Sequence, residues 1–170
     1  MRGQWTQIVV LIFLVTVVAG GATAQQNPPP IIQALEGESI QVQVQFNPKE
    51  ITIDKPVPWQ KHKNSKGDTP TLEFTDAEPR TLAVELLFDV CETNADVRAA
   101  YVGKLEKLSL INEGLGRPPL VSFTWGNAFP GFKSVIENFN TRYTLFLPDG
   151  TPCRATVNLR FKEASAATVR

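Results

Sequence analysis

The sequence is poor in the residues that catalysis and metal binding use most. Its 170 residues include a single histidine, His62, and two cysteines, Cys91 and Cys153. A zinc site needs several histidine or cysteine ligands at suitable spacing, and His62 has no such neighbour in the sequence. Scattered carboxylates such as Glu73 and Glu85 show no spacing that supports a wall hydrolase. We therefore expect no enzyme activity, no cofactor and no metal.

An excess of charge of one sign is also lacking. The sequence has 17 basic residues (lysine and arginine) and 17 acidic residues (aspartate and glutamate), so the formal net charge is zero. Such a balance gives no overall field that would attract nucleic acid or anionic lipid. A short lysine cluster at Lys61, Lys63 and Lys66 spans too few residues to change this. We expect no nucleic-acid partner.

Two cysteines are too few for a disulfide framework. They could form one bridge in an oxidising compartment, but the sequence does not place them within bridging distance. Two separate, small, buried thiols are the favoured interpretation, and pairing stays open as the alternative.

One long apolar run occurs, at the N-terminus. Arg2 precedes an uncharged stretch over residues 8–19, and an Ala-x-Ala sequence ends at Ala24 before Gln25. This order is typical of a signal peptide. A membrane anchor counted over residues 5–24 and a misassigned start are the alternatives for residues 1–24. Residues 25–30 then form a proline-rich spacer.

A pattern of period two dominates residues 31–164. Apolar and polar residues alternate over residues 40–46, 51–53, 82–88, 121–125, 143–147 and 153–161, which predicts strands with one wet face. Around residues 132–139 the alternation is imperfect, which indicates a bulge or an edge strand. Pro148, Asp149 and Gly150 predict the turn of a hairpin between the last two strands.

One helix is predicted after Thr93 or Asn94, either of which could cap it. Apolar residues at positions 97, 101, 105 and 108 share one face of this helix. Together these patterns predict a mainly β (α+β) domain over residues 31–164, with residues 165–170 as a tail. We expect an antiparallel β-barrel or sandwich of about seven strands with one flanking helix.

Three positions, Trp59, Trp125 and His62, invite a functional interpretation. We expect Trp59 and Trp125 to be core or interface residues. His62 lies in a polar stretch and is expected in a solvated loop. This stretch is either a projecting loop that contacts a neighbouring subunit or a free surface loop.

An ordered series of short motifs adds a family resemblance. They are FNPKE at 46–50, PWQKHK at 58–63, LEFT at 72–75, FTWG at 123–126 and LPDGTP at 147–152. The series resembles the N-terminal domain of contractile injection system tube proteins, the spike–tube adaptors of phage-tail-like particles. It covers residues 31–163. Many relatives continue into a LysM module, and we expect any role of that module to be absent here or supplied elsewhere.

The resemblance implies a structural role without catalysis. Such a protein would form a hexameric ring that joins a spike to inner-tube or baseplate subunits, in a particle assembled in the bacterial cytoplasm, with release left open. Candidate subunit-contact residues in the motifs are Asn47, Pro48, Trp59, His62, Lys63, Trp125, Pro148, Asp149 and Gly150. The alternative is an exported or membrane-anchored β binding module at the cell envelope. A membrane contact is expected only if residues 1–24 are retained.

Mass spectrometry of the native protein tests the alternatives for residues 1–24. Signal-peptide cleavage predicts a mature N-terminus at Gln25, whereas an anchor predicts the intact chain in the membrane fraction. A protein that begins well after Ala24 and is recovered inside cytoplasmic particles would contradict export.

Overall fold

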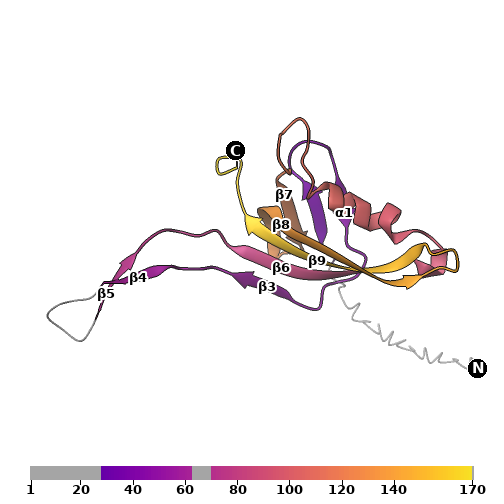
Figure 1. Cartoon of the computed structure of the whole chain (residues 1–170), viewed down its shortest axis with the longest axis horizontal. Coiled ribbons are helices and arrows are strands. Elements are labelled where there is room, and N and C mark those ends of the chain that lie inside the picture. The colour runs from indigo at the N-terminus through magenta and orange to yellow at the C-terminus, as the bar shows by residue number, and fades with distance from the viewer. Residues whose placement is uncertain (1–27, 63–69, 170) are drawn as a thin grey trace, which may run out of the picture.

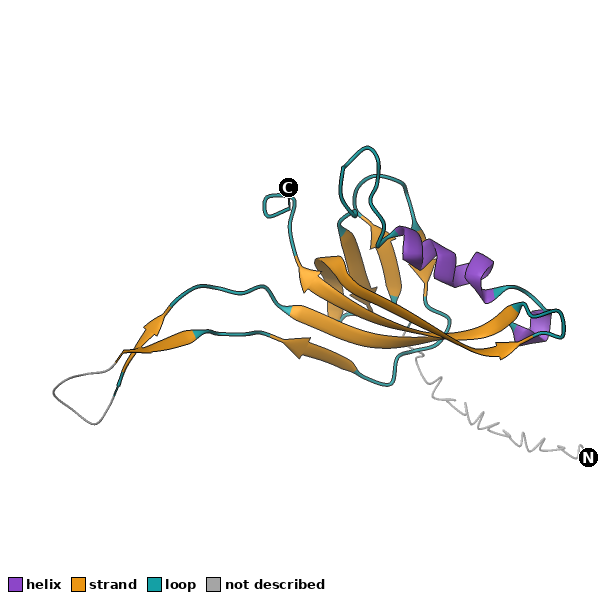
Figure 2. Ribbon diagram, viewed as in Figure 1, coloured by secondary structure: helices purple, strands orange, loops and turns teal. Residues whose placement is uncertain are grey.

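The computed structural model describes residues 28–62 and 70–169. It is mainly β, antiparallel, with one short helix, which confirms the predicted fold class (Figures 1 and 2). The segment expected to be a signal peptide or anchor, residues 1–24, lies outside the described residues. No helix in the described part of the chain is long and apolar enough to cross a membrane.

The main sheet has seven strands in the order β2-β1-β7-β8-β9-β6-β3. These strands are β1 (Ile31–Ala34), β2 (Gln41–Gln43), β3 (Ile51–Asp54), β6 (Thr81–Asp89), β7 (Val121–Trp125), β8 (Phe129–Phe146) and β9 (Pro152–Glu163). A separate two-stranded sheet pairs β4 (Trp59–His62) with β5 (Thr71–Phe74). The alternation at residues 40–46 yields only the short β2, and β1, β4 and β5 were not predicted.

Strand β8 merges two predicted strands into one. It pairs with β7 through residues 129–134 and with β9 through residues 134–146, so residues 135–139 have a strand partner on one side only. The expected bulge is present, because the β8–β9 register shifts between Ile136 and Asn138. A bulge inserts an extra residue, bends the strand and breaks the apolar alternation, which explains why the sequence pattern looked interrupted there.

The predicted hairpin turn between β8 and β9 is confirmed. The Leu147 N–H donates to the Thr151 carbonyl over 2.8 Å, and the Gly150 N–H donates to the Leu147 carbonyl over 2.9 Å. Gly150 has a φ of +85°, a conformation that glycine adopts without steric cost. The Asp149 carboxylate accepts the Thr151 N–H, which fixes the turn from within.

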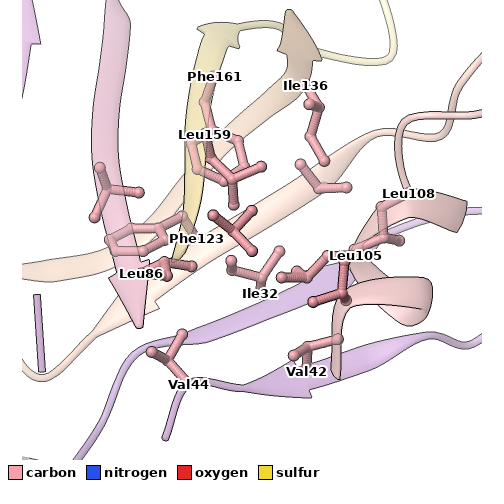
Figure 3. Packing of buried hydrophobic residues seen from close by; sticks show 14 of the residues in the cluster. Ile32, Val42, Val44, Leu86, Leu105, Leu108, Phe123, Ile136, Leu159 and Phe161 are labelled. Atoms are coloured by element: carbon pink, nitrogen blue, oxygen red, sulfur yellow. The ribbon is translucent and has the colours of Figure 1, made fainter. Parts of the chain in front are cut away.

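One face of the sheet and one face of the helix enclose a single core. Residues of β6 and β9 alternate between buried and more exposed, and Leu86, Leu159 and Phe161 point into the core that Figure 3 shows. Leu105 and Leu108 of the helical region enter the same core. Burial of this apolar surface is the main favourable contribution to folding.

The helix consists of a π-helical turn (Arg98–Val102) that continues into α1 (Gly103–Lys107). The predicted apolar face is confirmed in part. Val97, Leu105 and Leu108 are fully buried, while Tyr101 is half-buried and stacks on Phe88 at 4.9 Å between ring centroids. Neither Thr93 nor Asn94 caps the helix. The Asp96 carboxylate accepts the Arg98 N–H over 2.8 Å instead, because it lies closer to the first turn.

A disulfide joins Cys91 and Cys153, whose Cα atoms lie 4.8 Å apart. The favoured interpretation of two separate thiols is therefore wrong. Strands β6 and β9 stay paired as far as Asp89 and Arg154, and the Val90 N–H donates to the Cys153 carbonyl over 2.9 Å. This pairing places the two cysteines side by side although 62 positions separate them in the sequence.

Replacing both cysteines by serine, Cys91→Ser with Cys153→Ser, should lower the free energy of unfolding by about 2–5 kcal/mol. The reason is that the bridge restricts the unfolded chain over a loop of 62 positions. Urea unfolding measures the loss. As the control, a reductant should destabilise the original protein by the same amount and leave the variant unaffected. Equal free energies of unfolding of the variant and of the original protein, both without reductant, would contradict this expectation.

Candidate assembly interface

The most exposed feature of the molecule is an arm between β3 and β6, which we define as residues 55–62 and 70–79. Strands β3 and β6 pair up to Asp54 and Thr81, and the arm continues their hairpin away from the rest of the domain (Figure 1). Prolines at positions 56, 58, 70 and 79 lie along it. Proline cannot donate to a strand ladder, so Pro56, Pro58 and Pro79 interrupt the pairing between the main sheet and the β4–β5 pair.

The β4–β5 pair has an apolar face. The register places Trp59 opposite Phe74 and Lys61 opposite Leu72, and residues two apart on a strand share a face. The rings of Trp59 and Phe74 meet edge to face, 5.6 Å between centroids. Trp59 is 56% exposed, Leu72 54% and Phe74 48%, so these three large side chains remain half in water.

The opposite face of the arm is polar. Gln60 lies opposite Glu73 and His62 opposite Thr71. The His62 Nε2 and Glu73 Oε2 atoms are 2.7 Å apart and join the two strands. His62 is exposed, as expected, but it lies in a strand rather than in a loop. The loop was predicted because the sequence does not reveal the pairing of β4 with β5. Lys63 lies outside the described residues.

The arm exposes large apolar side chains that the described part of the chain does not cover. An isolated two-stranded ribbon is at best marginally stable in water. No residue of either strand is buried by the described part of the chain. Large apolar side chains gathered on a projecting element commonly mark a protein–protein contact. The segment therefore projects from the domain, and its contact with a neighbouring subunit stays a prediction.

Asn47 and Pro48 lie apart from the arm, in the connection from β2 to β3. Pro48 is buried and Asn47 exposed. Both line an open groove on the outer face of the sheet, where the side chains that alternate with the core residues of β6 and β9 also lie. Its lining includes Phe46, Ala83, Leu87 and Asn158.

The remaining candidate residues occupy two further places. Trp125 ends β7, is half-buried and stacks on Phe129, with ring centroids 6.4 Å apart. Its indole N–H is buried without an acceptor among the described residues. Pro148, Asp149 and Gly150 form the β8–β9 turn, beside the exposed Phe146. Trp59 and His62 therefore lie on opposite faces of β4, and the other candidates among the described residues lie elsewhere.

Sequence reasoning missed the second half of the arm. Leu72, Glu73 and Phe74 supply its apolar face and the partner of His62. The alternation of apolar and polar residues at positions 72–74 was the available signal, but it is too short to predict a strand by itself.

The sheet edges offer a second kind of contact. Strands β2 and β3 each have a neighbour on one side only within the described sheet. The outer side of such a strand presents backbone N–H and C=O groups that another chain can pair with. Within residues 28–62 and 70–169, no group of three or more histidine, cysteine, aspartate or glutamate residues could hold a metal ion.

Comparison with known proteins identifies one matching family. The family model for the contractile injection system tube protein matches residues 32–170, which confirms the resemblance seen in the motifs. No curated protein matches the sequence.

Replacing the two aromatic residues of the arm, Trp59→Ser with Phe74→Ser, should change the free energy of unfolding of the domain by less than about 0.5 kcal/mol. These side chains are exposed and contribute little to the core. Phe161→Ala, which empties a fully buried position, should cost about 3–5 kcal/mol and serves as the control. Urea unfolding measures both. A loss in the arm variant as large as in the control would show that the arm packs on the core.

Proposed function

Because this chain belongs to the contractile injection system tube protein family, we propose that it forms the ring that joins the spike of such a device to its inner tube. Family membership makes it a structural component of a tail-like contractile device that assembles with other subunits. The finer role is a baseplate spike–tube adaptor or a tube-initiating ring. No catalysis belongs to this role.

The observation that carries the proposal is the arm. A ring subunit needs surfaces that only neighbouring subunits can cover, and the apolar face of Trp59, Leu72 and Phe74 is such a surface. The free edges of β2 and β3 add backbone groups for further pairing. Head-to-tail contacts between different surfaces of identical subunits generate closed rings when the rotation closes. A homo-hexamer that binds spike and inner-tube or baseplate subunits fits these surfaces.

A second function is favoured by a different observation. The disulfide between Cys91 and Cys153 is typical of proteins in oxidising compartments and rare in the cytosol. Together with the signal-like residues 1–24, it supports an exported or membrane-anchored β binding module at the cell envelope. Alkylation of free thiols in freshly lysed cells separates the two proposals, because a cytoplasmic subunit would be alkylated at both cysteines and an exported one at neither.

Native mass spectrometry of the purified full-length chain should show a ring, and the ring should bind both spike and inner-tube subunits in a pull-down. Trp59→Ser with Phe74→Ser should weaken ring formation about tenfold or more, since it removes the aromatic contact area of the arm. Lys107→Glu, an exposed change on α1, is the matched control. A monomeric protein that binds neither partner would contradict the proposal.

A further inference from the structure

The two legs of the arm carry opposite charges. Residues 55–62, the rising leg, contain Lys55 and Lys61 and no carboxylate. Residues 70–79, the descending leg, contain Glu73, Asp76 and Glu78 and no lysine or arginine. The whole chain is neutral, so this separation is a local property of the arm.

The antiparallel pairing gives each leg its own edge. Strands β4 and β5 pair only with each other in the described part of the chain, so each has one open side. The leg with the lysines therefore runs along one edge of the ribbon and the leg with the carboxylates along the other, with Lys61 on the apolar face and Glu73 on the polar face. A copy of the ribbon placed alongside in the same orientation would set its β4 beside β5, antiparallel, with unlike charges together. A copy in the reversed orientation would place two legs of the same charge side by side, and like charges repel.

Contacts within the chain leave much of this charge available. The Lys55 ammonium donates to the backbone carbonyl of Glu78 and not to its carboxylate. Lys61, Asp76 and Glu78 are exposed and make no ion pair with any described residue. His62 and Glu73 form the one close contact between a basic and an acidic side chain of the two described legs.

We propose that the arms of neighbouring subunits lie side by side in one direction, with the basic leg of each copy against the acidic leg of the next. This inference rests on the proposed ring and names the partner of the arm as a second copy of this chain. Complementary charges contribute mainly to orientation and to rejection of the wrong pairing, rather than to affinity. Here they would allow only head-to-tail contacts, the kind that closes into a ring.

The prolines restrict where such arms can pair. Pro56 and Pro58 lack backbone donors in the rising leg, and Lys61 lies on the exposed edge of β4. Proline and lysine are common protections against unspecific edge pairing. The rising leg can therefore pair only through β4, and the acidic leg offers Asp76 and Glu78, which follow β5, to accept Lys61.

Cross-linking between single-cysteine variants tests this arrangement in the full-length chain. In the oxidised purified protein both natural cysteines form the Cys91–Cys153 disulfide, so an introduced cysteine is the only free thiol. Gln60→Cys labels the rising leg and Thr71→Cys the descending leg. An equal mixture of the two variants, treated with a short bismaleimide, should yield cross-linked dimers, while each variant alone should yield at least fivefold fewer.

Charge reversal in the same assay supplies a second measurement. Lys61→Glu in both labelled chains should lower the yield about fivefold, since an attraction becomes a repulsion. Adding Asp76→Lys to the Lys61→Glu chains should restore the yield, and Lys107→Glu should leave it unchanged. Sodium chloride should lower the yield of the unreversed mixture, because exposed charges are screened.

Native mass spectrometry of the same samples separates the possible failures. A ring whose single variants cross-link as well as the mixture would overturn the head-to-tail order. An intact ring without any cross-link would overturn the contact between arms and leave the proposed function standing. If the original protein, without an introduced cysteine or a charge reversal, forms no ring, both the contact between arms and the proposed function are overturned.

Discussion

The closure of the sheet around its core uses hydrogen bonds that converge at Asp89, the last residue of β6. Its backbone N–H and carbonyl both pair with the side-chain amide of Gln45, over 2.8 and 2.7 Å. Its carboxylate accepts the Cys91 N–H and two N–H groups of Arg154, the nearer at 2.5 Å. The Cys91 N–H, followed by the Arg154 guanidinium, lowers the pKa of this carboxyl, so it remains ionised and able to accept.

This junction explains how an open sheet encloses a core. Gln45 follows β2 at one end of the strand order, and Asp89 ends β6 near the other end. Their pairing holds the segment after β2 against the end of β6, so Val44 and Leu86 face the same core (Figure 3). The helix covers part of that core through Leu105 and Leu108. Because the domain buries its apolar residues without the arm, the arm is free to serve as a contact surface.

The elements that were predicted from the sequence are those whose pattern is local. Strands β6, β7 and β9 carry an apolar residue at every second position, and the turn at Gly150 uses residues suited to its dihedral angles. Strand β8 was divided because its bulges break the alternation. The arm was missed because its alternation of apolar and polar residues, at Trp59 and at Leu72 to Phe74, is too short to predict a strand. The disulfide was not predicted, because a strand pairing between distant segments creates it. The motif residues of the family were located, but their roles as contacts remain predictions.

The disulfide and the arm lie in separate parts of the fold. They lie at opposite ends of β6, since Thr81 adjoins the arm and Asp89 the bridge, and nine residues of strand span about 30 Å. Strand pairing at Asp89 and Arg154 and the Val90 hydrogen bond already hold the cysteines' backbone together. The bridge therefore adds to a geometry that the sheet specifies by itself, and it acts mainly by restricting the unfolded chain. It follows that oxidation would make the domain more stable without reshaping the arm, so the assembly surface is compatible with either compartment.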